Sequence, residues 1–432
     1  MEVERFDAIV IGAGPAGLSA AYVMAKAGLN VVVIERGDFP GAKNVMGGVI
    51  YRHPTEEIFP DFWRTAPLER HVDQQSLWIL GKGTVVQVGH KNETWSRAPY
   101  NAFTVLRAKF DKWAARQVVE AGALIVPETL VEDVIRQDGR IVGVHTGRAQ
   151  GDLYADVVIA ADGVNSVIAR KAGLHREWVA NQLALAVKEI IALPRERIQD
   201  RFHLEEDAGA TIELVGEATA GMMGTAFIYT NKDSLSIGAG AVISDLVAAH
   251  LNPNDLLEQL KAHPAVRPLV EGGETREYLA HLIPEGGYHA LPQLATDGLL
   301  VVGDAAMLVN SYHREGSNLA MISGKFAAET VIEAKQRGDF SAAGLSGYRR
   351  RLEQSFILKD MKKYANAGHY FERNKHFFTL YPELANMAAA DFLTVDGVPK
   401  RAKQWSIVRK ALRARSPLGM LRDALGAARR ML

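Results

Sequence analysis

The segment from residue 6 to residue 35 constrains the fold more than any other part of the sequence. FDAIVIG (6–12) and VVVIE (31–35) are short apolar runs suited to buried parallel strands, and residues 15–27 have helical spacing. The first strand is joined to the helix by Gly12, Ala13, Gly14, Pro15, Ala16 and Gly17. The glycines permit a tight turn, a close backbone approach to a ligand and close packing of helix on strand. We therefore predict a right-handed β-α-β unit.

An acidic residue completes this pattern. Glu35 ends the second strand, eighteen residues after Gly17. The amino end of the helix neutralises a pyrophosphate, and a carboxylate at Glu35 accepts hydrogen bonds from ribose hydroxyls while repelling a 2′-phosphate. A lone glycine motif is weak, but strands on both sides and the acidic residue make it specific. The unit predicts a site for FAD or NAD and excludes NADP.

Two later apolar strands distinguish FAD from NAD. ADVVIAADG (155–163) and DGLLVVGDAA (297–306) both end in Asp and Gly, a feature that an NAD domain does not need. Each pair has a simpler reading, because Asp162 and Gly163 could form an ordinary turn and Asp304, after Gly303, could cap a helix. Their joint order and spacing favour FAD as the cofactor.

Composition limits the other functions. Fifty basic and fifty acidic side chains give no net charge, so no nucleic-acid partner is expected. The chain has no cysteine, which excludes disulfides, thiolate zinc sites and a cysteine-ligated iron-sulfur cluster within it, and we expect no metal site. The charged start, MEVERFD, lacks the order of a signal peptide and predicts a cytoplasmic protein. The uncharged run 8–25 contains three glycines and a proline, which favour a strand, turn and helix over a membrane helix.

The chain is expected to fold as interleaved domains of an α/β protein. We predict a discontinuous Rossmann-type FAD domain from 1–60, 100–185 and 290–345. The alternating stretches in 61–99 and 186–289 predict an inserted antiparallel β substrate domain. Residues 346–432 read as helices that end in a basic amphipathic tail, in which residues 400–432 hold ten Lys or Arg against one acid, Asp423.

Taken together, these motifs resemble the glutathione-reductase-like FAD fold of flavin hydroxylases and geranylgeranyl reductases. The resemblance implies that Asp304 holds the ribityl chain. It also implies roles for six further residues: backbone amides at the isoalloxazine from Gly316, Ser317 and Asn318, contact with the pyrophosphate or ribityl from Arg107, and contact with the adenine side from Arg36 and the Val131 backbone.

Less general stretches resemble one family more closely. PGAKNVMGGVIY (40–51), LRAKFDKWAA (106–115), HLIPEGGYHALPQL (281–294) and SYHREGSNLAMISGK (311–325) are similar to the FixC family of flavoprotein subunits. This implies an FAD subunit of a FixABCX-like complex that passes electrons from electron transfer flavoprotein α/β-like subunits to quinone. Because the chain has no cysteine, any iron-sulfur cluster must lie on a partner, and the resemblance implies a separate small ferredoxin-like subunit. A loop with Lys43, Asn44, Gly47 and Gly48 is then expected to contact the flavin, or to be an ordinary polar loop.

Beyond the cofactor, the alternatives stay open. Tyr312 or His313 is hypothesised to hydrogen-bond a quinone carbonyl or the flavin edge; alternatively both only close a loop over FAD. The basic tail either lies on the inner face of the cytoplasmic membrane, docks on an acidic partner, or is simply solvated. The aromatic residues between 370 and 381 form either a helix core or a membrane or quinone contact. Rival functions are a prenyl reductase of the geranylgeranyl type, a monooxygenase, and a binding protein without flavin.

Overall fold

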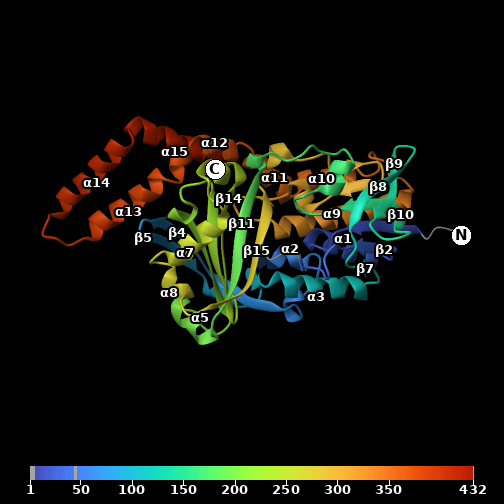
Figure 1. Ribbon diagram of the computed structural model, residues 1–432, viewed down its shortest axis with the longest axis horizontal. Coiled ribbons are helices and arrows are strands. Elements are labelled where there is room, and N and C mark those ends of the chain that lie inside the picture. Colours follow the sequence, from blue (N-terminus) through green and yellow to red (C-terminus); the bar gives the residue numbers. More distant parts are fainter. Residues whose placement is uncertain (1–4, 43–45, 432) are drawn as a thin grey trace. The chain divides into compact units, whose positions relative to one another are not determined.

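The computed structural model describes residues 5–42 and 46–431, which form two compact units (Figure 1). The first unit comprises residues 1–69, 101–183 and 281–362, and the second comprises 70–100, 184–280 and 363–432. Residues 346–432 are divided between these two units. The first helix of this stretch, α10 (Gly347–Gln354), belongs to the first unit, because Arg351 pairs with Glu329 and Glu333 of α9 (Ser317–Arg337).

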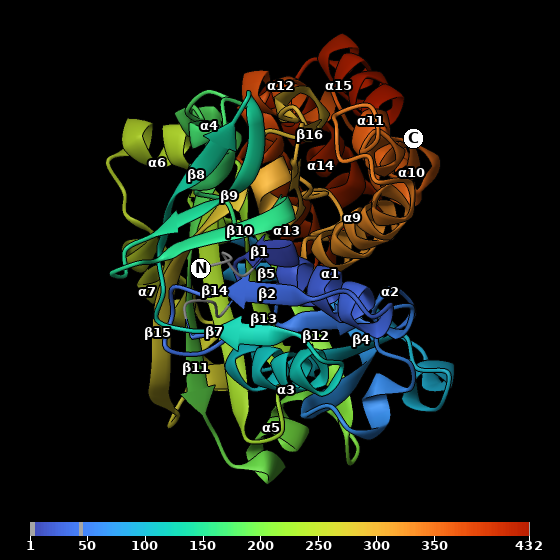
Figure 2. The same cartoon turned by 90° about the vertical axis from the view of Figure 1, so that its right-hand side faces the viewer.

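A mixed sheet forms the core of the first unit (Figure 2). Its parallel strands lie in the order β17 (Leu299–Val301), β10 (Asp152–Ala160), β1 (Arg5–Ile11), β2 (Val31–Ile34) and β7 (Leu124–Val126). β16 (Ala295–Thr296) and β9 (Arg140–Thr146) add antiparallel edges, and β8 (Val131–Gln137) pairs with β9. The residues of β1, β2 and β10 are largely apolar and buried, as a sheet covered on both faces requires.

Glycines allow two helices of the first unit to pack unusually closely. α1 (Pro15–Lys26) lies against β1, where a Cβ on Gly17 would come within 2.0 Å of the Gly12 carbonyl oxygen. α9 lies against α1, where a Cβ on Gly324 would come within 2.1 Å of the Ala16 carbonyl oxygen. The remaining elements of this unit are β3 (Val49–Tyr51), β6 (Ala102–Val105), α2 (Arg52–Glu56), α3 (Arg107–Glu120), α4 (Val167–Lys171) and α11 (Phe356–Lys363).

The second unit is built on a largely antiparallel sheet. Its strands are β4 (Leu68–Gly81), β5 (Thr84–Lys91), β11 (Leu183–Ala192), β12 (Ala208–Gly216), β13 (Gly224–Thr230), β14 (Ser234–Val242) and β15 (Glu274–Pro284). A hairpin joins β13 to β14 through residues 231–233. The sheet is not wholly antiparallel as expected: β12 pairs with β4 in parallel. β4 comes from a separate early segment, so no hairpin fixes its direction.

Helices cover one face of this sheet and bury an apolar core. They are α5 (Arg195–Phe202), α6 (Ile243–Ala249), α7 (Pro253–Ala262) and α8 (Arg267–Val270). Leu256, Leu257 and Leu260 of α7 pack with Ile237 of β14 in one buried cluster. Residues 184–280, which separate the second and third segments of the first unit along the chain, thus contribute a buried core to the second unit.

The chain ends in helices held by one buried carboxylate. These are α12 (Ala367–Arg373), α13 (Leu380–Leu393), α14 (Lys400–Ala414) and α15 (Pro417–Met431). The Asp423 carboxylate accepts two bonds of 2.7 Å from Arg415 and one each from Tyr381 (2.6 Å) and His376 (2.9 Å). The aromatic rings of Tyr370, Phe371, Phe377 and Tyr381 contact one another around this group.

Candidate functional site

The predicted site residues follow four neighbouring strands at one edge of the first sheet. In the parallel register, Ile11 lies level with Ile34 and with Ala160, and Ala160 lies level with Val301. Gly12, Glu35, Asp162 and Gly303 therefore gather where these strands end, which is where open α/β sheets bind ligands. Gly12 (φ +99°) fits only without a side chain, because its Cβ would lie 2.4 Å from the Ala161 carbonyl oxygen.

The amino end of α1 is shaped for a phosphate. Gly14 has an extended backbone at the helix N-cap, and a Cβ on it would meet nothing within 4 Å, so the approach to the helix amides is open. The Glu35 carboxylate accepts hydrogen bonds from the backbone amides of Ala13 (2.8 Å) and Gly37 (2.6 Å). The Glu35 carbonyl oxygen accepts one from the Thr129 amide (2.9 Å). This last bond brings the segment that leads to Val131, at the start of β8, beside Glu35.

The order of the strands gives the direction of a bound dinucleotide. Glu35 follows β2, the glycine turn follows β1, and Asp162 and Asp304 follow β10 and β17. A ligand with its adenosine ribose at Glu35 and its pyrophosphate at α1 must place its other half beside β10 and β17. The segment after β17, residues 303–318, therefore belongs to the flavin half of the site.

Polar groups in that half lack partners among residues 5–42 and 46–431. The Asp304 carboxylate receives no hydrogen bond there; burial raises its pKa to about 6, against the opposing effect of Arg107. One oxygen of Asp162 accepts from the Ile168 amide (2.9 Å), whereas the other is buried without a partner, and burial raises the pKa of this group. Asn318 donates to Glu315 (3.1 Å), and its side-chain oxygen is also buried and without a partner.

Three chain segments meet around Arg107. Its guanidinium forms a two-pronged ion pair with Asp111 (2.9 and 2.8 Å) and donates to the Met46 carbonyl oxygen (2.8 Å). A Cβ on Gly47 would come within 2.4 Å of the Ser317 hydroxyl oxygen and 2.9 Å of the Arg107 guanidinium. The loop that continues through Gly48, where the carbonyl oxygen accepts from the Val105 amide, is thus held between α3 and the start of α9. Lys43 and Asn44, expected on this loop, lie outside the described residues.

Tyr312 and His313 lie at the tip of a tight turn. Asn310 and Glu315 exchange backbone hydrogen bonds of 2.9 and 3.1 Å across it. His313 is exposed at the tip and Tyr312 is half-buried. Burial, reinforced by the charge of Glu285, raises the pKa of Tyr312, so its phenol keeps its proton. The turn continues through Gly316, at the N-cap of α9, into Ser317 and Asn318.

Sequence reasoning missed two titratable residues at this site. Burial raises the pKa of Glu285 to about 7, and a hydrogen bond from the Ser311 side chain opposes that rise. Burial lowers the pKa of His281 to about 4, with further lowering by the positive charges of Arg107 and the exposed Arg36. Both residues lie in the stretch 281–294, and neither has a spacing to other polar residues that indicates a function.

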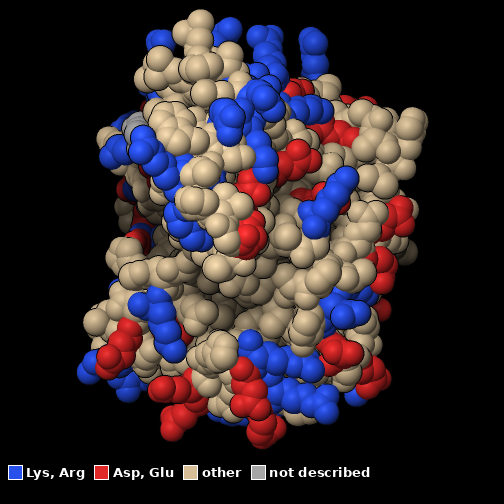
Figure 3. Space-filling view, turned by 90° about the vertical axis from the view of Figure 1, so that its left-hand side faces the viewer, with Lys and Arg blue, Asp and Glu red and all other residues tan. Residues whose placement is uncertain are grey.

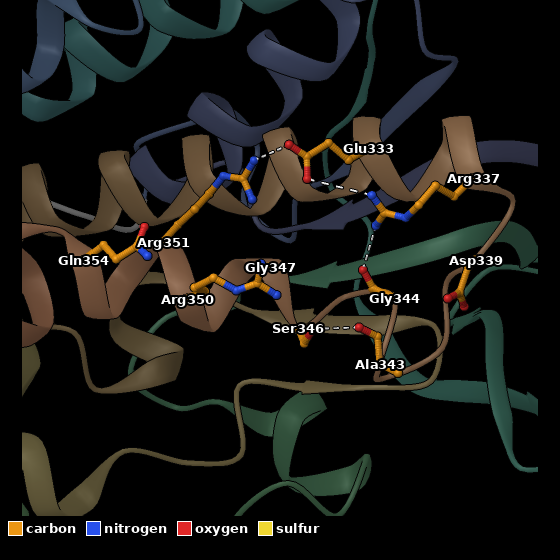
Figure 4. A pocket seen from close by; sticks show the side chains of 10 residues that line it. All are labelled: Glu333, Arg337, Asp339, Ala343, Gly344, Ser346, Gly347, Arg350, Arg351 and Gln354. Carbon is orange, nitrogen blue, oxygen red and sulfur yellow. Dashed lines mark hydrogen bonds and ion pairs between the residues drawn. The ribbon is translucent and has the colours of Figure 1, made fainter.

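A separate cavity of about 620 Å³ lies beside α9 and α10 (Figure 4). Glu333 lies between Arg351 and Arg337, and Arg337 also donates to the Gly344 carbonyl oxygen (3.0 Å). The charges of Arg337 and Arg351 are compensated by neighbouring acids, so we interpret the cavity as space between packed helices and not as the ligand site.

The residues at the sheet edge fit FAD. The open helix terminus, the Glu35 carboxylate and the oxygens of Asp304 and Asn318 that have no partner among the described residues are groups that the two halves of that molecule would use. Within the part of the chain that the structure describes, no group of three or more His, Asp or Glu side chains could hold a metal ion.

Comparison with known proteins agrees with this site. Residues 7–199 match the model for FAD dependent oxidoreductases, and residues 367–432 match that for the ETF-QO/FixC family C-terminal domain. Protein FixC of Azotobacter vinelandii is 46% identical over 98% of both chains. The probable electron transfer flavoprotein-quinone oxidoreductase YdiS of Escherichia coli K12 is 40% identical over 99% of both.

Solved structures share the fold at low identity. A geranylgeranyl bacteriochlorophyll reductase-like protein of Thermoplasma acidophilum is 20% identical, with a TM-score of 0.75 over 98% of this chain and 100% of that one. The flavin-dependent brominase Bmp2 is 19% identical, with a TM-score of 0.68 over 95% of this chain and 100% of that one. Flavin-dependent proteins thus share the architecture, and the identity to FixC proteins runs the length of the chain. The chain therefore belongs to the ETF-QO/FixC family and is an FAD-dependent oxidoreductase.

Proposed function

We propose that this protein takes electrons from a two-subunit electron transfer flavoprotein and delivers them through FAD to quinone, within a FixABCX-like complex. The observation that carries the proposal is full-length identity of 40–46% to FixC proteins and to a probable electron transfer flavoprotein-quinone oxidoreductase. The nucleotide edge of the first unit supports it, because it offers the groups that a flavin dinucleotide requires.

The chain's own residues bind and orient the cofactor. Glu35 accepts from the adenosine ribose, the amides at Gly14 and Ala16 face the pyrophosphate, and Asp304 accepts from the ribityl hydroxyls. Backbone amides from Gly316 to Asn318 face the isoalloxazine, with Arg107 fixing the loop opposite. FAD supplies the electron chemistry when bound, so the protein's task is positioning and control of protons.

Protons for the reduced quinone must come from side chains near the flavin half. The exposed His313 lies at the tip of its turn, within reach of water, and the phenol of Tyr312 keeps its proton and can act as a hydrogen-bond donor. If His313→Ala leaves both the rate of quinone reduction and the flavin potential as in the parent protein, these two residues only close the loop.

The C-terminal helices support contact with an anionic membrane surface. α14 exposes Trp405 (59%) on a strip with Val408 and Leu412, and α15 exposes Leu418 (76%) on a strip with Leu421 and Leu425. Exposed arginines flank both strips, and Figure 3 shows Lys and Arg gathered over the upper part of the face it presents. Apolar strips with flanking cations are typical of helices that lie in a membrane interface. Within the described residues, no helix is long and apolar enough to cross a bilayer.

This membrane contact has a direct test. Leu421→Glu should weaken sedimentation with phosphatidylglycerol vesicles, whereas Val247→Glu, at a similarly exposed aliphatic residue of α6, should not. Equal sedimentation of both variants with the parent protein, or equal binding to neutral phosphatidylcholine vesicles, would exclude the membrane reading. Loss of a co-purifying acidic subunit in Leu421→Glu would instead assign the strip to a partner.

The electron-transfer proposal is tested with the FAD-loaded protein under anaerobic conditions. Adding a reduced electron transfer flavoprotein pair should bleach the flavin absorbance, and a short-chain quinone should restore it. Purification from the native cell should recover the same pair together with a small ferredoxin-like subunit, which would carry the cluster that this cysteine-free chain does not ligate. Turnover of a prenyl lipid without any protein partner would favour the reductase alternative.

A further inference from the structure

Asn318, in the first turn of α9, has a buried side chain whose amide finds a partner at only one end. Its NH2 group donates to the Glu315 carboxylate at 3.1 Å, whereas its oxygen is buried and has no partner among the described residues. Asn318 is only 4% exposed. A buried acceptor without a donor costs folding free energy, so we expect this oxygen to meet a donor that does not belong to the chain.

The half-buried Glu315 determines which end of this amide stays without a partner. A carboxylate only accepts hydrogen bonds, so it must face the NH2 end of Asn318, and the oxygen of the amide must point away from it. Glu315 is itself fixed by its turn, because it exchanges backbone bonds of 2.9 and 3.1 Å with Asn310, whose side chain also donates to the carboxylate (3.4 Å). Burial raises the pKa of Glu315, but the bonds from Asn318 and Asn310 oppose this rise and favour the ionised form.

The position of Asn318 relates this oxygen to the flavin half of the site. Ser317, the preceding residue, packs against Gly47, where a Cβ would come within 2.4 Å of the Ser317 hydroxyl oxygen and 2.9 Å of the Arg107 guanidinium. The strand order indicates that residues 303–318 belong to the flavin half. That half of FAD has donors of two kinds, the N–H of the ring and the hydroxyls of the ribityl chain.

We propose that Glu315 is a positioning residue that turns the Asn318 side-chain carbonyl toward the flavin half, where this carbonyl accepts a hydrogen bond from an N–H or hydroxyl group of FAD. Glu315 acts only through Asn318, which is the residue that contacts the cofactor. This inference rests on the proposed function in one respect, the placement of the flavin half beside residues 303–318. It requires neither a partner protein nor quinone.

The test is the Kd for FAD of the full-length chain, measured by quenching of FAD fluorescence at pH 8. Asn318→Leu removes the acceptor and Glu315→Ala removes the group that orients it, so each should raise the Kd about 2- to 12-fold, as the loss of one hydrogen bond does. The double variant should bind FAD as Asn318→Leu does, because Glu315 then has nothing to orient. An unchanged Kd in either single variant, or additive effects in the double variant, would overturn the proposal.

A rescue separates orientation of the amide from damage to the turn. A carboxylate at position 318 accepts with either oxygen and needs no orienting partner, so Asn318→Asp added to Glu315→Ala should lower the Kd again. Asn310→Ala removes the other donor to Glu315 and leaves Asn318 in place, so it should raise the Kd less than Glu315→Ala does. The absence of rescue, or an equal rise in Asn310→Ala, would assign Glu315 to the structure of the turn and not to the cofactor site.

A second measurement applies if Glu315→Ala does not fold, as judged by circular dichroism. The carbon-13 signal of the Asn318 side-chain carbonyl, assigned by its absence from Asn318→Leu, should move when FAD binds to the parent protein; an unmoved signal overturns the proposal. Failure of electron transfer to quinone would leave these binding measurements intact and would count only against the proposed function. Unimpaired FAD binding by Asp304→Asn would count against the placement of the flavin half itself.

Discussion

Replacing Asp304 by asparagine should raise the free energy of unfolding of the FAD-free protein and should weaken FAD binding. The carboxylate is partly buried, it receives no hydrogen bond from the described residues, and its pKa is raised from 3.8 to about 6 by burial despite the nearby Arg107. An unpartnered charge of this kind costs folding free energy, whereas the ribityl hydroxyls of bound FAD would supply the missing partners. The same side chain therefore acts in opposite directions on stability and on binding.

The size and pH dependence of the effect follow from that pKa. Each pH unit between the unfolded and folded values corresponds to about 1.36 kcal/mol, so ionised Asp304 lowers the free energy of unfolding by up to about 3 kcal/mol. An acid with a raised folded pKa binds more protons in the folded state, so stability falls as pH rises from about 4 to 6 and is level above 7. Loss of a charge-assisted bond to FAD costs about 1.5–3 kcal/mol, or roughly a 10- to 150-fold higher Kd.

Two measurements test this reasoning. Urea unfolding of FAD-stripped Asp304→Asn and parent protein should show the variant as the more stable at pH 8, with the difference vanishing toward pH 4. Quenching of FAD fluorescence should show its weaker binding at pH 8. A variant that is no more stable than the parent at pH 8, or that binds FAD equally well, would refute the assignment of Asp304 as a carboxylate kept for the cofactor.

Three other substitutions have expected outcomes. Gly17→Ala should abolish or greatly reduce bound FAD and lower the thermal midpoint, because the new Cβ would overlap the Gly12 carbonyl oxygen; flavin absorbance per chain and circular dichroism measure both. Glu35→Gln should raise the Kd for FAD about tenfold, corresponding to roughly 1.4 kcal/mol of lost ribose contact, as seen by fluorescence titration. Asp423→Asn should destabilise the C-terminal helices by about 1–3 kcal/mol at pH 7 through lost bonds from Arg415. Burial alone would raise the Asp423 pKa, but the hydrogen bonds to its carboxylate together outweigh that effect and lower the pKa to about 2. The difference in melting temperature between the parent protein and Asp423→Asn should therefore shrink as pH falls from 4 toward 2.

Local rules account for what could be predicted of the first unit. The strand, glycine turn and helix at residues 6–27 follow from apolar runs and from spacing within one short segment, and the structure has them as β1 and α1. The later Asp-Gly strand ends also appear as predicted, since a buried parallel strand is marked by its own composition.

Long-range pairing limited the prediction of the second unit. The parallel partnership of β12 and β4 joins residues more than 130 positions apart, and alternation of side chains within each strand does not report the direction of its neighbour. The placement of α10 likewise depends on its ion pairs to α9, a contact that helical periodicity alone does not encode.

Site residues could be predicted where their spacing forms a known motif. Residues whose chemical properties change only because folding buries them could not. Glycines and Glu35 carry their roles in their spacing. Arg107 is expected near the ligand from its resemblance alone, whereas its ion pair with Asp111 follows from their spacing of one helical turn. Glu285 belongs to no sequence motif. Its pKa is raised only when folding removes water from its carboxyl, which no sequence pattern reports.

Carboxylates on this chain divide into two kinds, and the division carries a functional argument. Asp423 is buried with an arginine, a tyrosine and a histidine around it, so every ionised oxygen is compensated and the group stabilises the fold. Asp304 and Glu285 form no ion pair among the described residues, and burial raises the pKa of each. Buried charges without a partner lower the free energy of unfolding unless a ligand or a proton compensates them. Asp304 follows β17, level with the strand ends after which Gly12 and Glu35 lie, and this position indicates that its missing partner is a ligand.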